Sequence, residues 1–89
     1  MCTMVVESTK ITGSGKGTNS WFPIQEVNVS YDHPFHAPME YTVNLDFTNE
    51  SMGPSARVVV ELSARSAEEL IGTIREALRR GEKAIAQGK

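Results

Sequence analysis

The residue types best suited to chemistry in this chain are concentrated in one short segment. Residues 30–38 read Ser-Tyr-Asp-His-Pro-Phe-His-Ala-Pro and include both histidines, His33 and His36, together with two of the four prolines. An imidazole is neutral enough near pH 7 to bind a metal ion or accept a proton. Proline fixes its own φ and favours an extended conformation in the residue before it. We therefore expect a stiff loop that holds the reactive side chains.

A transition-metal site is the leading hypothesis for this loop. His33, His36 and Cys2, the single cysteine, supply nitrogen and sulfur donors suited to zinc or another transition metal. A carboxylate from Glu40 or Asp32 would extend the set, and an open coordination position would let the metal polarise water or a substrate, as in an enzyme. One His-x-x-His pair is a weak motif, however, because strong zinc patterns contain two pairs of ligands.

Other roles for the same side chains stay open. A histidine beside Asp32 or Glu40 could act as a general base without a metal, and the candidate catalytic residues are His33, His36 and Glu40. Cys2 could be a nucleophile if a histidine or a helix N-terminus stabilises its thiolate, although a buried cysteine behaves as a small apolar residue. The histidines could also do no chemistry and only cap turns or pack against nearby aromatic rings.

The composition bounds the class of protein. A chain of 89 residues forms one small domain, 1–89, and buries about two-thirds of its unfolded surface, so a homo-oligomer would supplement its stability. The net charge of −2 and the lack of a basic stripe argue against a nucleic-acid partner. A single cysteine excludes an internal disulfide framework. Neither a signal peptide nor a long apolar run is visible, so we expect a cytoplasmic protein without a membrane partner.

Alternation of apolar and polar residues predicts four strands, at about 2–10, 24–31, 39–48 and 56–63. In the first strand we assign Cys2, Met4 and Val6 to the inner face, because that set is more apolar than the intervening one. The third strand has the clearest alternation and carries its apolar residues at odd positions.

The period then changes, which predicts a helix over about 66–85. Ser66 and Glu69 fit a capping box at its start. Its apolar stripe consists of Ala67, Leu70, Ile71, Ile74, Ala77 and Leu78. Strands joined by short connections prefer antiparallel neighbours, and one amphipathic helix can cover one face of the sheet. We therefore predict an α+β fold, a two-layer ββββα sandwich.

A simple meander would bring the candidate residues together. The end of the second strand would lie beside the start of the first, which places the histidine segment next to Cys2. The third strand would begin at the same end and bring Glu40 there. Cys2, His33, His36 and Glu40 would then share one end of the sheet, whereas a different strand order would separate them.

The alternative is a non-catalytic module that binds a small molecule or assembles into a homo-oligomer. It would use the polar face of the sheet, or Trp21 and Phe22 as apolar anchors. These two rings could instead cover the core. Residues 13–17 superficially resemble the end of a phosphate-binding loop, but Lys10 stands where the first glycine is required and no helix follows. We expect a flexible hairpin loop there.

Several segments resemble a small family of actinobacterial proteins of unknown function. They are the opening Met-Cys-Thr-Met, residues 13–17, Trp21-Phe22, residues 30–38 and residues 53–57. The resemblance covers nearly the whole chain and implies a bacterial cytoplasmic protein formed by one complete domain. It implies no activity, because no function is established for the family.

Overall fold

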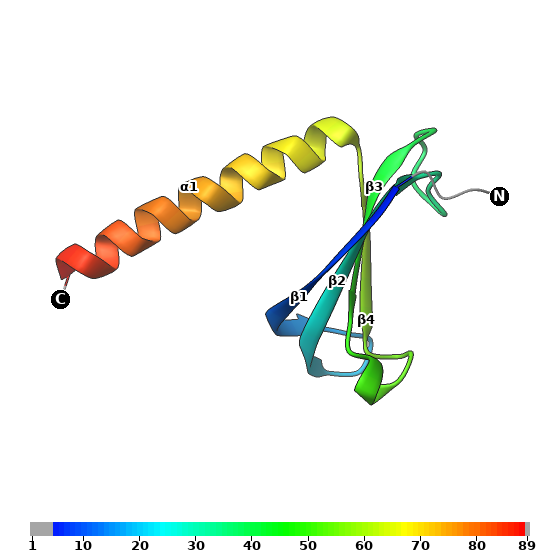
Figure 1. Ribbon diagram of the computed structural model, residues 1–89, viewed down its shortest axis with the longest axis horizontal. Helices are drawn as coiled ribbons and strands as arrows, with labels where there is room; N and C mark the ends of the chain where they lie inside the picture. Colours follow the sequence, from blue (N-terminus) through cyan, green and yellow to red (C-terminus); the bar gives the residue numbers. More distant parts are fainter. Residues whose placement is uncertain (1–4, 89) are drawn as a thin grey trace.

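The computed structural model describes residues 5–88, which form a four-stranded antiparallel sheet followed by one helix (Figure 1). The strands are β1 (Val5–Lys16), β2 (Trp21–Asp32), β3 (Thr42–Thr48) and β4 (Arg57–Leu62). A 3-10 helix (Glu50–Met52) separates β3 from β4, and the helix α1 spans Ala64–Gly88. The strand order β1-β2-β3-β4 is a meander. The predicted α+β class and ββββα order are confirmed.

Several boundaries differ from those predicted. β1 continues past residue 10 to Lys16, so the glycine-rich segment is strand and the hairpin turn lies at residues 17–20, closed by Gly17 N–H donating to the Ser20 carbonyl. β3 begins at Thr42, and residues 39–41, which were predicted as strand, belong to the preceding loop. α1 begins at Ala64, since Ser63, rather than Ser66, accepts the first free N–H groups.

The register separates the strands into an apolar and a polar face. Val29 pairs with Leu45, and Leu45 pairs with Val60. The apolar face comprises these three together with Val27, Tyr31, Val43, Phe47, Val58 and Leu62. The polar face comprises Asn28, Ser30, Asn44, Asp46, Arg57, Val59 and Glu61. Directly paired residues project to the same side of a sheet, so the alternation predicted for β2, β3 and β4 is present.

The predicted orientation of β1 is wrong. Val6 pairs with Ser30, so it lies on the polar face, whereas Glu7 pairs with Val29 of the apolar face. A strand at the edge of a sheet needs less apolar surface, and the two sets of alternating residues here differ little in hydropathy. The hairpin register decides the orientation instead, and it includes an irregularity between Lys10 and Gly13.

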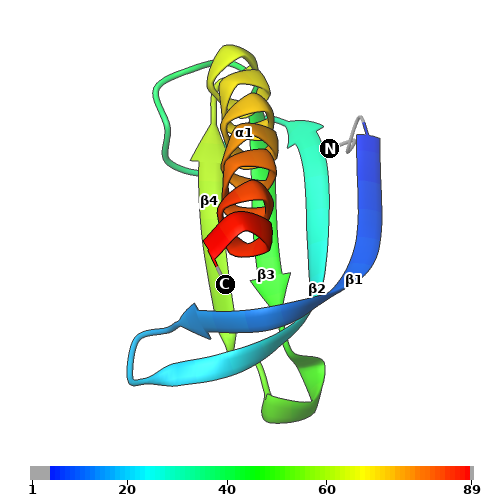
Figure 2. The ribbon, with the colours of Figure 1, turned by 90° about the vertical axis from the view of Figure 1, so that its left-hand side faces the viewer.

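This irregularity bends the β1–β2 hairpin, whose far end crosses the apolar face of the sheet (Figure 2). A Cβ atom at Gly15 would lie 2.8 Å from Ile24 Cδ1 and 3.5 Å from Val58 Cγ2. Glycine therefore allows the hairpin to approach β4 closely. Phe22, Val27 and Ala56 are the buried apolar residues of this small core.

The helix and the loop between β2 and β3 lie on opposite sides of the sheet, as the edge-on view of Figure 1 shows. Glu61 of the polar face accepts the backbone N–H of Phe35 in that loop. The helix is therefore on the side of the apolar face, from which it points away, and none of residues 64–88 is buried. No helix among residues 5–88 combines the length and apolarity needed to cross a membrane.

Asn49 ties the β3–β4 connection to the bent hairpin. It is 2% exposed, and its Nδ2 donates to the Pro23 carbonyl at 2.8 Å. Its Oδ1 accepts the N–H of Ser51 at 3.1 Å and the Ser51 hydroxyl at 2.7 Å. The polar atoms of this buried side chain are thus satisfied by groups of two segments, Pro23 of β2 and Ser51 of the β3–β4 connection.

We predict that Asn49→Ala lowers the free energy of unfolding by about 1–3 kcal/mol, because it removes three hydrogen bonds that join two segments, each worth about 0.5–1.5 kcal/mol before water replaces part of them. Urea denaturation followed by circular dichroism measures this change. Asn19→Ala, in the exposed hairpin turn, is the matched control and should stay within about 0.5 kcal/mol of the parent chain. Equal stabilities of the two variants would show that Asn49 does not join the two segments.

Candidate functional site: a groove under the histidine loop

Residues 33–41, which we name the histidine loop, are held against the polar face by the carboxylate of Glu61. Its oxygens accept the backbone N–H groups of three consecutive residues: Phe35 at 2.7 Å, His36 at 3.1 Å and Ala37 at 2.8 Å. Consecutive N–H groups around one carboxylate form a compact anion-binding nest. One side chain of β4 therefore joins the middle of the loop to the sheet.

These hydrogen bonds favour the charged form of Glu61. They lower the pKa of its carboxyl below the ordinary value, with the bond from Ala37 contributing most, that from Phe35 next, and the charge of His36 acting in the same direction. A group whose pKa is lowered on folding stabilises the fold above its ordinary pKa. That contribution is lost as the pH falls through the lowered folded-state pKa.

His33 is oriented by two contacts with neighbouring loop residues. Its ring stacks on the ring of Tyr41 with 4.8 Å between centroids, and its Nδ1 lies 3.0 Å from the carbonyl oxygen of Glu40. A carbonyl oxygen only accepts, so in the neutral ring Nδ1 carries the proton and Nε2 is the acceptor. An imidazole in this tautomer can bind a cation or accept a proton through Nε2.

The other predicted site residues contribute backbone groups to the hydrogen bonds of the loop. Glu40 offers its carbonyl oxygen to His33, and His36 donates its backbone N–H to Glu61. Within residues 5–88, no three histidine, cysteine, aspartate or glutamate side chains could together hold a metal ion, so His33, His36 and Glu40 form no such group by themselves. Cys2 lies outside the described residues, and a site that includes it stays a prediction.

A groove of about 550 Å³ lies on the polar face beside the histidine loop. Its floor is formed by the strands and consists of Val6, Asn28, Ser30, Asn44, Asp46, Arg57, Val59 and Glu61. The chain from Asp32 to Phe35 forms one wall. The fully exposed side chain of Phe35 stands at the rim, where it is available to a bound molecule.

Hydrogen bonds between side chains order the floor of the groove. Thr42 Oγ1 donates to Asn44 Oδ1 at 2.6 Å, and Asn44 Nδ2 donates to Ser30 Oγ at 3.2 Å. In the next row Ser8 donates to Asn28. Because the amide of Asn44 donates and accepts at once, its orientation is fixed before any ligand binds.

The charge of the groove is unbalanced. Arg57 Nε donates to Asp46 Oδ1 at 2.8 Å, and this hydrogen bond raises the pKa of the guanidinium above its ordinary value. Asp32 and Glu61 also line the groove, whereas Arg57 is the single lysine or arginine among the described lining residues. The groove thus carries excess negative charge at neutral pH and attracts cations more than anions.

The two predicted aromatic anchors are placed differently from each other. Phe22 is 5% exposed and belongs to the core, whereas Trp21 is 65% exposed at the start of β2. Of this pair, Trp21 alone offers a ring to a partner. Trp21 does not line the groove, so an anchor function for it would be separate from the site under the histidine loop.

Sequence reasoning predicted a polar face of the sheet but not that Glu61 and Arg57 of this face form part of the site. Glu61 binds backbone groups 24 to 26 positions earlier in the chain, and no local pattern indicates such a contact. Phe35 lies in the predicted loop, yet its full exposure depends on how Glu61 holds that loop. The one available sequence signal for this contact was an acidic residue on the strand opposite a loop that contains prolines. That combination does not specify a contact between the two.

Comparison with known proteins gives a family but no activity. The sequence model of the family DUF6295, described as a family of unknown function, matches residues 1–87. The chain therefore belongs to that family. The expectation of an uncharacterised family that covers nearly the whole chain is confirmed. Neither the curated proteins nor the solved structures contain a match to the chain. The function therefore has to be inferred from the geometry of the groove.

We predict that Glu61→Gln releases the histidine loop, because a neutral amide oxygen binds several N–H groups far more weakly than a carboxylate does. The amide resonances of Phe35, His36 and Ala37 should move and their hydrogen exchange should become faster. In the parent chain the same change should appear on acidification, once the pH falls below the lowered pKa of Glu61.

Glu50→Gln is the matched control, since it removes the same charge from the connection between β3 and β4. Its loop amides should behave as in the parent chain. Unchanged resonances in Glu61→Gln, at neutral and acidic pH alike, would show that another contact holds the loop.

Proposed function

We propose that this member of the DUF6295 family is a non-catalytic module that binds a small organic cation in the groove. The groove itself is the observation that carries the proposal, because its volume of about 550 Å³ falls within the range of ligand pockets, about 300–1,000 Å³. Its floor is ordered by hydrogen bonds and its wall is held by Glu61. A preformed site lowers the entropic cost of binding.

The lining residues indicate the class of ligand. Acidic side chains outnumber the one basic side chain, so a positively charged group is attracted. Asp46 lies at the middle of the floor, and the oxygen not used by Arg57 can accept a charge-assisted hydrogen bond. Val6 and Val59 are exposed apolar residues on the same floor. A primary ammonium joined to a small apolar body matches both features.

The histidine loop supplies two further contacts. The ring of Phe35 is fully exposed at the rim, and the face of an aromatic ring attracts a cation by about 0.5–2 kcal/mol. His33 presents Nε2 as an acceptor, since its Nδ1 is engaged by the Glu40 carbonyl. The proposed function therefore requires the loop to be in place, and it uses the loop as a wall rather than as a catalyst.

We expect benzylammonium, an ammonium with a small apolar body, to shift the amide resonances of the groove in a titration of the ¹⁵N-labelled chain. Asn28, Asn44 and Phe35 should respond in a saturable manner. Benzoate has the same apolar body and the opposite charge, so it should leave these resonances unchanged. Equal shifts with both probes, or no shifts at millimolar benzylammonium, would contradict the proposal.

Asp46→Asn should weaken benzylammonium binding by about tenfold or more, as expected for the loss of a charge-assisted hydrogen bond. Glu50→Gln removes one negative charge outside the groove and should bind as the parent chain does. If the two variants lost affinity equally, the net charge of the protein, and not the groove, would account for the binding.

Metal binding at His33, His36 and Cys2 is a second candidate function, supported by one observation. Histidines that bind metals usually donate their other ring N–H to a carbonyl or a carboxylate, as His33 does to Glu40. In this case elemental analysis of the untagged protein should find near-stoichiometric zinc or another transition metal, which a His33→Ala/His36→Ala variant lacks. No metal after reconstitution with zinc, iron and copper would remove this candidate.

A further inference from the structure

The helix α1 carries an apolar stripe that its own sheet leaves uncovered. The side chains of the stripe become more exposed along the helix: Leu70 is 40% exposed, Ile71 49%, Ile74 50%, Leu78 55% and Ile85 73%. This trend follows from the direction of the helix, which moves away from the sheet after its first turns (Figure 1). An aliphatic stripe this long, exposed to water, marks a surface that another element covers.

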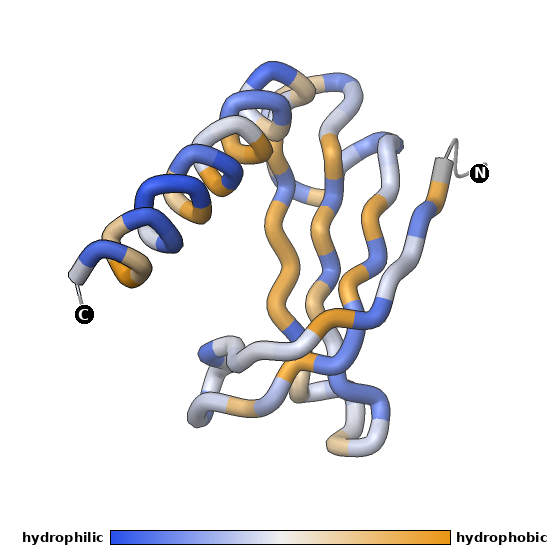
Figure 3. Tube along the Cα trace, turned by 60° about the vertical axis from the view of Figure 1, so that its left-hand side comes forward, coloured by the Kyte–Doolittle hydropathy of each residue, from blue (hydrophilic) through white to orange (hydrophobic). Residues whose placement is uncertain are grey.

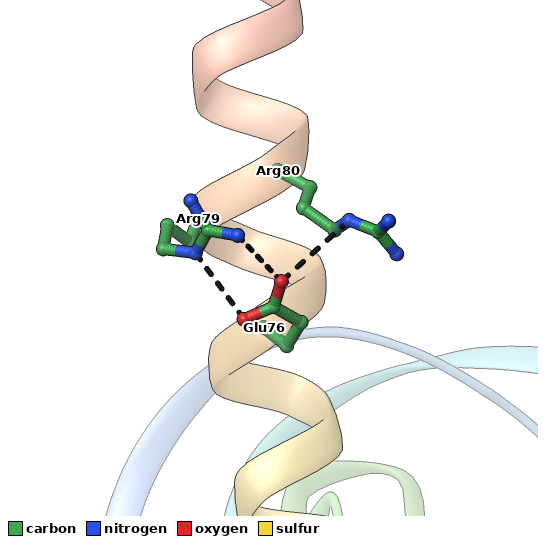
Figure 4. Close-up of polar contacts among 3 residues, drawn as sticks. All are labelled: Glu76, Arg79 and Arg80. Carbon is green, nitrogen blue, oxygen red and sulfur yellow. Dashed lines mark hydrogen bonds and ion pairs between the residues drawn. The ribbon is translucent and has the colours of Figure 1, made fainter.

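The opposite side of α1 is adapted to water. Glu76 accepts hydrogen bonds from Arg79, with an Oε2–Nη2 distance of 2.6 Å, and lies 3.5 Å from Arg80 Nε (Figure 4). Arg65 and Glu69 form a further pair at the start of the helix. Charged residues spaced three and four apart satisfy one another without a partner. The polar side therefore needs no covering, whereas the apolar stripe does.

The apolar face of the sheet is the second uncovered surface. Figure 3 shows hydrophobic segments along the strands and along the side of the helix that is turned toward them. The bent hairpin covers the end of this face near Val58, but Leu45, Val60 and their neighbours remain partly exposed. The stripe and the face form the two sides of an open apolar wedge.

The exposed area is too large for a monomer of this mass. A folded monomer of 9.8 kDa is expected to expose about 5,200 Å², whereas the chain exposes 6937 Å². Its radius of gyration is 15.4 Å, against about 12 Å for a compact domain of this length. If two chains each buried the excess of about 1,700 Å², the interface would total about 3,500 Å², a size typical of obligate homodimers.

A very short connection restricts how α1 can move relative to its own sheet. Ser63 is the single residue between β4 and α1. Its hydroxyl accepts the N–H of Ser66 at 3.1 Å, and its carbonyl accepts the N–H of Ala67 at 2.9 Å. These bonds continue the first turn of α1 to the end of β4 and so restrict the movement of the helix relative to the sheet. An apolar surface from another molecule can cover the wedge without any movement of the helix.

We infer that this molecule is a second copy of the chain, whose α1 enters the wedge while the first copy's α1 enters the wedge of the second. The stripe from Leu70 to Ile85 spans about 22 Å along the helix, and β3 is about 24 Å long, so each helix matches the length of its partner's sheet. The stripe is aliphatic and uncharged, which suits a self-complementary two-fold contact. The groove lies on the other face of the sheet and stays accessible.

Light scattering coupled to size-exclusion chromatography tests the stoichiometry. The molar mass measured for the parent protein should be twice the 9.8 kDa of one chain. A mixed sample of labelled and unlabelled chains tests the geometry, because isotope-filtered NOEs should connect Ile74 and Leu78 of one copy with Val29 and Leu45 of the other. A monomer, a different number of subunits, or a dimer whose NOEs lie elsewhere would overturn the inference.

Matched substitutions on the two sides of the helix complete the test. Ile74→Asp places a charge in the stripe and should convert the dimer into a monomer, or prevent folding, with circular dichroism distinguishing the two. Gly72→Asp adds the same charge on the opposite, open side, where nothing lies within 4 Å of a new Cβ, and should leave the dimer intact. A dimer that persists in Ile74→Asp, or is lost in Gly72→Asp, would also overturn the inference.

Discussion

The candidate site of this protein depends on one interaction, the binding of three consecutive backbone N–H groups by Glu61. A loop of nine residues with two prolines makes few backbone hydrogen bonds of its own, so its place in the fold is set by what anchors it. Glu61 anchors it over the polar face, and the groove then exists between the loop and the strands. His33 and Phe35 acquire their positions as a consequence, one fixed by its neighbours and the other exposed at the rim.

The two faces of the sheet differ in their chemistry. The polar face holds an ordered network of amides and hydroxyls under an excess of negative charge, which suits a small cation better than a core. The apolar face lacks enough covering within one chain, because α1 points away from it. The proposed ligand binding on one side and the inferred assembly on the other therefore do not compete, and a dimer would present two grooves on its outer surfaces.

The architecture follows from local patterns, whereas the site does not. Alternation in β2, β3 and β4 and the helical period predicted the order of elements correctly, because each pattern extends over a whole element. The alternation did not predict the orientation of β1, because Val6 and its neighbours are of similar hydropathy and a bulge sets the register. Residues 13–16 were predicted as a loop from their glycines, but Gly15 is needed for close packing within a strand. Glu61 contacts loop residues that lie far from it in the sequence. No periodic pattern of residues predicts such a contact.

Native-state amide hydrogen exchange at neutral pH tests the central claim most directly, because it reports whether the loop is closed in solution. Phe35, His36 and Ala37 donate to Glu61 and should exchange clearly more slowly than Thr18 and Asn19, which lie in the exposed hairpin turn. Slow exchange at these three amides would establish the wall of the groove. Exchange as fast as in the hairpin turn would show that Glu61 does not hold the loop, and the account of the site would be wrong.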